Sequence, residues 1–148
     1  MVTDAIPGNV FETPYKHIAF AVNTEGHNDA GFAGQVSSKI PSFANTGGNE
    51  LGDILEGFVE GKNFYGLVCH SFGGDGWENA PNAITACLDK LNVPEDETIA
   101  VVLMGAGMIG QLSGANVKEN IRAIHRSKKK CVIYNLMYTK KAVMNEIG

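Results

Sequence analysis

The chain has 148 residues, of which 44% are hydrophobic and 19% are charged, with a formal net charge of −4. This length and apolar content suffice for one hydrophobic core, so we expect residues 1–148 to form a single domain. The negative charge argues against a non-specific nucleic-acid binder. The lack of a long apolar run or a basic leader predicts a cytoplasmic protein that neither spans nor enters a membrane.

The first half of the chain shows one clear buried strand and two helical patterns. Residues 1–6, or the region of Val10, form a weak strand pattern, and "HIAFAVN" at residues 17–23 is a buried strand. A short helix is predicted for residues 33–40, where Pro41 ends it. Residues 49–61 place five apolar side chains at helical spacing, which predicts a second helix.

The second half alternates regularly between strand and helix patterns. Strands are predicted at "FYGLVCH" (64–70), "TIAVVLM" (98–104) and "CVIYNLMY" (131–138), and the fully apolar middle one indicates a central position. Helices are predicted within residues 79–94 and 114–127. This alternation predicts an α/β fold with a mostly parallel sheet covered by helices on both faces.

A glycine-rich loop follows each of three buried strands. The loops are "NTEGHNDAGFAG", "CHSFGGDGW" and "GAGMIGQLSG". In an open α/β sheet, ligands bind beyond the carboxyl ends of the strands, and glycine lets main-chain N–H groups approach an anion closely. Three such loops at one edge favour a phosphate-bearing ligand, although each loop alone is also compatible with a tight turn.

The third loop, at residues 105–110, has the spacing G-x-G-x-x-G that is typical of dinucleotide-binding folds. That fold opens with this motif, whereas here only one further strand follows it. The acidic residue expected about 20 residues further on is absent. We therefore interpret the loop as a phosphate-binding loop of a different fold.

The three cysteines, Cys69, Cys87 and Cys131, are widely spaced and lie among apolar neighbours. This pattern favours buried free thiols in a reducing compartment, and no pair has the spacing of a zinc site. We predict neither a metal nor a resident cofactor.

The segment around the first loop resembles the opening of a macro domain, the ADP-ribose-binding module. Asn23, Gly26, Gly31 and Ala33 match the pattern N-x-x-G-x-x-x-x-G-[IV]-A of one branch of that family. This branch contains ADP-ribose-1″-phosphate phosphatases and terminal ADP-ribose–protein glycohydrolases. Residues 99–124 resemble the second phosphate loop of the family and the helix that follows.

The resemblance covers residues 8–136 and implies a three-layer α/β/α macro-domain-like fold with a mixed, mostly parallel sheet. It also implies a pose for ADP-ribose, in which Gly8, Asn9 and Val10 meet the adenine. The family usually has Asp where this chain has Asn9, so the resemblance implies a weaker or altered base preference. Tyr134 and Asn135 flank the adenine in this pose, although Tyr134 also fits an ordinary core position.

In the implied pose, the remaining loops bind the phosphates and the distal ribose. The first helix start holds one phosphate, residues 105–110 hold the other and enclose the distal ribose, and Asn23 lies beside that ribose. The implied ligand-binding residues are Gly8, Asn9, Val10, Asn23, Gly31, Phe32, Ala33, Gly105, Ala106, Gly107, Met108, Ile109, Gly110, Tyr134 and Asn135.

The catalytic groups of the glycohydrolase branch are missing. That branch uses a Lys at the strand end where this chain has His70, and an acid in the second glycine loop, which here has none. The candidates that remain are His27, Asp29, His70 and Asp75, and His27 with Asp29 is suited to activating a water. Three of them have a plain alternative: His27 bonds its loop, Asp29 caps the next helix, and His70 ends its strand.

Two hypotheses from different classes therefore stand. The first is a module that binds ADP-ribose or a closely related derivative without turnover, either free or attached to a protein. The second is a hydrolase that acts on ADP-ribose-1″-phosphate or on protein-linked ADP-ribose. The lone tryptophan, Trp77, is either a lid over the ligand or an anchor for its loop.

Overall fold

Strands and helices alternate along the chain in the computed structural model, which describes residues 1–28, 31–43, 49–72 and 75–148, and for Met108 the main chain alone. The elements in chain order are β1 (Val2–Pro7), η1 (Val10–Glu12), β2 (His17–Asn23), α1 (Gly31–Lys39), η2 (Pro41–Phe43), β3 (Ile54–Val59), β4 (Lys62–His70), α2 (Ala80–Lys90), β5 (Thr98–Val102), α3 (Met108–Leu112), α4 (Val117–Arg126), β6 (Lys130–Asn135) and α5 (Lys140–Met144).

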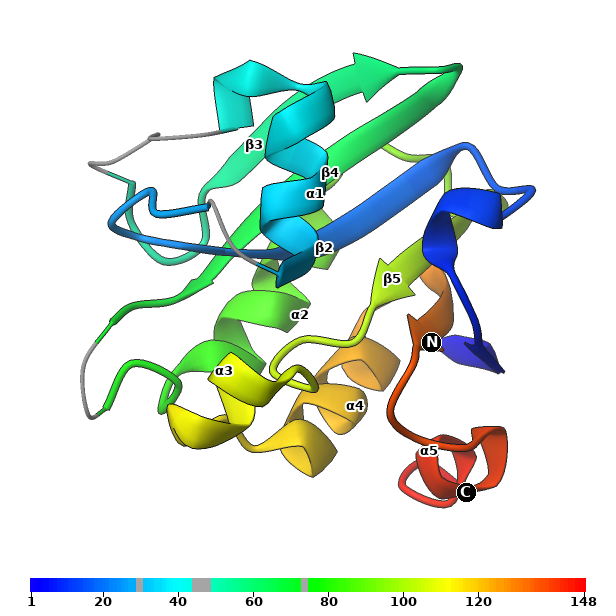
Figure 1. The fold of residues 1–148 in the computed structure, drawn as a ribbon. Coiled ribbons are helices and arrows are strands. Elements are labelled where there is room, and N and C mark those ends of the chain that lie inside the picture. Colours follow the sequence, from blue (N-terminus) through cyan, green and yellow to red (C-terminus); the bar gives the residue numbers. More distant parts are fainter. Residues whose placement is uncertain (29–30, 44–48, 73–74) are drawn as a thin grey trace.

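Within these residues, six strands form one sheet in the order β1-β6-β5-β2-β4-β3 (Figure 1). Every neighbouring pair is parallel except β3 and β4, which pair antiparallel. The expected mixed, mostly parallel sheet is thus confirmed, and so is the interior position of the apolar strand β5. Because β1, β6, β5, β2 and β4 run in the same direction, their carboxyl ends meet at one edge.

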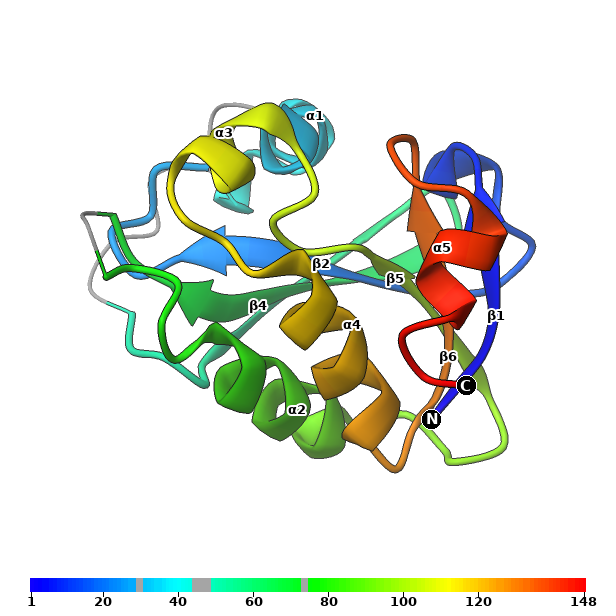
Figure 2. The ribbon, with the colours of Figure 1, turned by 90° about the horizontal axis from the view of Figure 1, so that it is seen from below.

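Helices cover both faces of the sheet, as expected from the alternating pattern. Figure 2 shows α1 and α3 on one side of the sheet and α2 and α4 on the other. Successive strand residues point to opposite faces, so Phe20 and Val22 of β2 pack with Val36 of α1, whereas Ala19 packs with Ile84 of α2 and Ile121 of α4.

The helix predicted for residues 49–61 is wrong, because this segment contains strand β3. A two-residue turn joins β3 to β4, and both turn residues have positive φ: 54° at Glu60 and 81° at Gly61. Such turns match the twist of a hairpin. In strand geometry Gly57 faces Phe43, and a Cβ there would lie 2.5 Å from that ring. Pairing with β4 and packing against η2 therefore override the helical spacing.

Two short α-helices were not predicted. The five-residue helix α3 lies within the third glycine loop and begins directly after Gly107, and α5 follows β6 and buries Val143 against β1 and the core. None of the helices in the described segments has the length and apolar character that crossing a bilayer requires.

Candidate functional site

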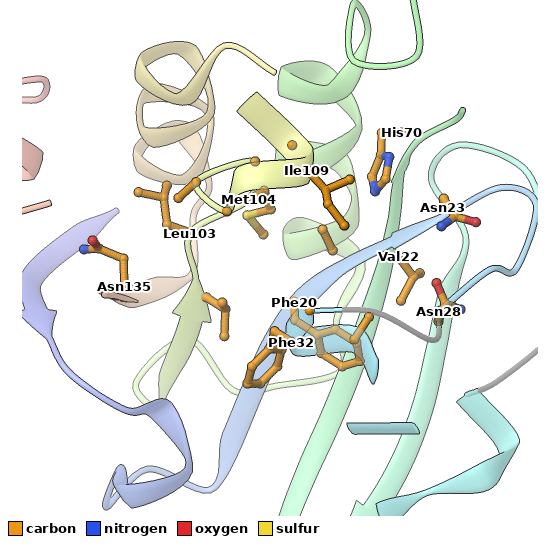
Figure 3. A pocket seen from close by; sticks show the side chains of 18 of the residues that line it. Phe20, Val22, Asn23, Asn28, Phe32, His70, Leu103, Met104, Ile109 and Asn135 are labelled. Carbon is orange, nitrogen blue, oxygen red and sulfur yellow. The ribbon is translucent and has the colours of Figure 1, made fainter. Parts of the chain in front are cut away.

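A cavity of about 810 Å³ lies at the carboxyl edge of the parallel strands (Figure 3). Its lining residues fall within residues 8–10, 20–23, 27–28, 31–35, 70–72, 77, 102–113 and 134–137. The segments come from the ends of β1, β2, β4, β5 and β6 and from the starts of α1 and α3. The topology thus brings the three glycine loops to one place.

The cavity wall includes nearly all the residues that the sequence predicted for the site. These are Gly8, Asn9, Val10, Asn23, His27, Gly31, Phe32, Ala33, His70, Gly105, Ala106, Gly107, Ile109, Gly110, Tyr134 and Asn135. Asp29 lies outside the described residues. Met108 is described only by its main chain, at the start of α3. Asp75 is exposed and is not among the lining residues.

The first glycine loop begins α1 with a glycine in the left-handed region. Gly31 has φ +60°, and a Cβ added to it would meet no atom within 4 Å. An L side chain rarely adopts this backbone conformation. The next residues, Phe32 and Ala33, also line the cavity, so main chain from the first turn of the helix forms part of the wall.

The third glycine loop folds tightly on itself, which explains two of its glycines. Gly105 has φ +78°, and a Cβ there would lie 2.5 Å from the side chain of Ala115. A Cβ on Gly110 would lie 2.7 Å from the Cα of Gly105. The Asn120 side chain donates to the carbonyl of Met104 (3.0 Å), and Gln111 donates to that of Ala106 (2.7 Å). These bonds fix the direction of the loop main chain.

Asn23 holds the loop that follows β2. Its Oδ1 accepts from the N–H of His27 and its Nδ2 donates to the carbonyl of the same residue, both at 3.0 Å. The side chain is 5% exposed and borders the cavity. One amide thus uses both of its polar atoms to set the position of His27, whose ring is exposed and stacks on Phe72.

His70 ends strand β4 and stacks on Trp77, with ring centroids 4.0 Å apart and planes 7° apart. Its Nδ1 is buried and has no hydrogen-bond partner among the described residues. Burial lowers the pKa of His70 to about 4, against smaller opposing effects of the Ser71 main chain and Glu25. The imidazole is therefore neutral at pH 7, and the imidazolium form that would act as a general acid is not populated there.

The β1–β6 end of the cavity carries two asparagines whose oxygens are already engaged. Oδ1 of Asn9 accepts from the N–H of Phe11 (3.0 Å) and caps η1. Oδ1 of Asn135 accepts from the N–H groups of Met137 (2.9 Å) and Tyr138 (2.5 Å), and its buried Nδ2 has no partner in the described part of the chain. Only an oxygen accepts these N–H groups, so the fold uses the oxygens of both amides for its own main-chain hydrogen bonds.

Tyr134 is placed in the core, although it borders the cavity. It is 4% exposed and its hydroxyl donates to Oγ1 of Thr13 at 2.8 Å. The ring therefore packs among the strands and supports the floor of the site.

The cavity is uncharged along its described lining. No Asp, Glu, Lys or Arg occurs among the lining residues, and the described residues contain no cluster of three or more His, Cys, Asp or Glu side chains fit for a metal ion. An anionic ligand would therefore meet main-chain N–H groups and neutral amides in place of cationic side chains.

The three cysteines are buried and free, and burial raises the pKa of Cys87 and Cys131 to about 11.

Several lining residues were not predicted from the sequence. Trp77 was predicted only as a lid or an anchor; it is 8% exposed, belongs to the core and borders the cavity behind His70. Phe72 was missed, although it follows a predicted strand end by two residues. The other unpredicted lining residues are Phe20, Ala21, Val22, Asn28, Gln35, Ser71, Val102, Leu103, Met104, Ser113, Leu136 and Met137.

No protein-family model matches the sequence, and no curated protein matches it. Solved structures, however, resemble the fold over almost the whole chain. The X-domain of IBV superposes with a TM-score of 0.67 over 98% of this chain and 96% of its own length, at 15% identity. A macrodomain protein from Streptomyces coelicolor superposes with a TM-score of 0.63 over 91% of this chain and 99% of its own length, at 16% identity.

An alphavirus structure, P23pro-zbd, matches with a TM-score of 0.68 and 16% identity over 97% of this chain. The present chain spans only 22% of the length of that protein. At these identities the likeness establishes the fold and leaves the activity open.

Proposed function

We propose that this chain, which has the macrodomain fold, binds ADP-ribose or a closely related derivative without turning it over. One observation carries the proposal: the glycine segments 31–33 and 105–110 line one cavity at the carboxyl edge of the sheet. Main-chain N–H groups freed by small residues are suited to a pyrophosphate, which carries charge but needs no cationic partner when several N–H groups converge on it.

The chemistry of the lining supports binding over hydrolysis. The described lining holds neither a carboxylate to act as a base nor a lysine to act as a nucleophile. His70 occupies the strand-end position at which the resemblance implies Lys, and it is neutral at pH 7. His27 is exposed and borders the cavity, so it is the one described group that supports the alternative, hydrolysis of ADP-ribose-1″-phosphate or of protein-linked ADP-ribose.

Titration calorimetry with ADP-ribose tests the binding directly. We expect a dissociation constant in the micromolar range, roughly −8 kcal/mol. Absence of heat with ADP-ribose and with its derivatives would overturn the proposal.

A pair of matched glycine variants then tests the location of the site. Gly31→Glu introduces a bulky anion at the first loop and should abolish binding. Gly61→Glu is the control, because Gly61 also has positive φ (+81°) and open space around its Cα, but lies in the β3–β4 turn. Both changes impose a similar strain of about 1 kcal/mol. Equal affinities in the two variants would remove the first loop from the site.

Turnover is tested by incubating the protein with ADP-ribose-1″-phosphate and with an ADP-ribosylated peptide. We expect no product from either. Product formation that is lost in His27→Ala would replace the binding proposal with the hydrolase alternative.

A further inference from the structure

Four aromatic rings gather at the β4 end of the cavity. His27 stacks on Phe72 with centroids 5.5 Å apart and planes 18° apart, and His70 stacks on Trp77 at 4.0 Å and 7°. All four residues line the cavity. Phe72 is 52% exposed and His27 is exposed too, so the first pair presents open ring surface, whereas Trp77 is buried behind His70.

This aromatic end lies across the sheet from the two asparagines. Asn135 ends β6 and His70 ends β4, and β5 and β2 separate these strands in the sheet. Figure 3 shows Asn135 and His70 on opposite sides of the cavity, with Met104 and Ile109 between them. The glycine segments that we propose for the pyrophosphate occupy the middle. The cavity thus extends to both sides of these segments, toward the asparagines at one end and toward the aromatic rings at the other.

One carboxylate lies beside the aromatic end, outside the cavity lining. The Glu25 carboxylate accepts from the N–H of Phe72 (3.2 and 3.3 Å) and from the hydroxyl of Thr24 (2.7 Å). Slight burial works to raise the pKa of Glu25, but these hydrogen bonds outweigh it and the pKa is lowered. A carboxylate therefore lies next to the Phe72–His27 pair, and no Lys or Arg side chain lines this end among the described residues.

We propose that the aromatic end binds a planar, cationic ring carried by the distal sugar, so that the preferred ligand is an oxidised nicotinamide dinucleotide, NAD⁺, in place of free ADP-ribose. Ring faces attract a cation and stack on a flat heterocycle, and the nearby carboxylate offsets its positive charge. The cavity volume of about 810 Å³ lies in the upper part of the range for small-molecule sites. This inference rests on the proposed binding of the ADP-ribose unit.

Calorimetry with NAD⁺ and ADP-ribose on the same protein separates the two proposals. We expect NAD⁺ to bind about tenfold more tightly, the size of one good stacking or cation–π contact. If ADP-ribose binds as well as NAD⁺ or better, this inference falls and the proposed function stands. If neither binds, both fall.

The exposed phenylalanines provide a matched pair of variants. Phe72→Ala should lower the affinity for NAD⁺ to that for ADP-ribose, and Phe72→Tyr should keep the preference for NAD⁺. Phe58→Ala is the control, because Phe58 is 67% exposed on β3 and does not line the cavity. Both side chains are largely exposed, so thermal unfolding should confirm that the variants fold. An unchanged NAD⁺ to ADP-ribose ratio in Phe72→Ala would overturn the inference.

NADH and Glu25→Gln test the charge. The reduced ring is neutral, so NADH should bind several-fold more weakly than NAD⁺, and Glu25→Gln should narrow that difference without changing the affinity for ADP-ribose. Equal affinities for NAD⁺ and NADH in the wild type would overturn the assignment of a cationic ring.

Discussion

Gly110 decides whether the third glycine loop keeps its shape, and Gly110→Ala is the perturbation that tests this. The new Cβ would lie 2.7 Å from the Cα of Gly105, 2.9 Å from its carbonyl oxygen and 3.0 Å from its carbonyl carbon. All three are main-chain atoms, so no side chain can rotate away. The loop itself must move, at a cost of about 1–3 kcal/mol.

Helix propensity acts in the opposite direction at this position. Gly110 lies in α3, where alanine is favoured over glycine by up to about 1 kcal/mol. Propensity alone therefore predicts that Gly110→Ala stabilises the protein. The contacts with Gly105 outweigh it, and we expect a net loss of about 1–2 kcal/mol in the free energy of unfolding, measured by urea denaturation.

Gly107→Ala is the matched control from the same loop. Gly107 has φ −72°, and a Cβ there would meet no atom within 4 Å. The variant should unfold within about 0.5 kcal/mol of the wild type. If Gly110→Ala is as stable as Gly107→Ala, or more stable than the wild type, the conclusion that Gly110 packs closely on the main chain of Gly105 is wrong.

Two further changes probe the residues that shape the cavity. Burial lowers the pKa of His70 from 6.5 to about 4, so as the pH falls through 6.5 the unfolded chain gains a proton that the folded chain does not. This group alone should lower the free energy of unfolding by about 3 kcal/mol between pH 7 and pH 4. Urea denaturation of His70→Gln should lack this pH-dependent loss of stability. Identical pH profiles for the variant and the wild type would contradict the prediction. Asn23→Ala removes both hydrogen bonds to His27 and should lower stability by about 1–3 kcal/mol and weaken ADP-ribose binding, whereas the exposed Asn92→Ala should change neither.

The place of the cavity could be predicted because it follows from topology. Buried strands such as residues 17–23 and 98–104 are recognisable from their apolar runs, and parallel strands necessarily end at one edge. Glycines after those strands then indicate where main chain lines a cavity. Of the fifteen residues predicted to bind the ligand, fourteen line this cavity, and only the side chain of Met108 lies outside the description. Their contact with a ligand stays a prediction.

The antiparallel strand β3 could not be recognised from its apolar spacing alone. Leu51, Ile54, Leu55 and Phe58 fit a helix, but the segment gains its stability from hydrogen bonds to β4, which lie outside any local pattern. The turn residues Glu60 and Gly61 are the local signal that favours a hairpin, since a two-residue turn ending in glycine between two apolar runs is typical of one.

The aromatic end of the site could not be predicted from the sequence, for a different reason. Phe72 and Trp77 come from an irregular loop, where no periodicity links side-chain direction to sequence position. The orientation of the Asn9 amide was equally inaccessible, since the N–H of Phe11 fixes it only after η1 has formed. The sequence indicated an acceptor oxygen at Asn9, and the fold turns that oxygen toward the main chain.

Backbone amide mapping by NMR during titration with ADP-ribose tests most directly whether main chain binds the pyrophosphate. The account predicts the largest shifts of N–H resonances within residues 31–33 and 105–110, the two segments that border the cavity. Shifts confined to other parts of the chain, or no shift in either segment at saturating ligand, would contradict it.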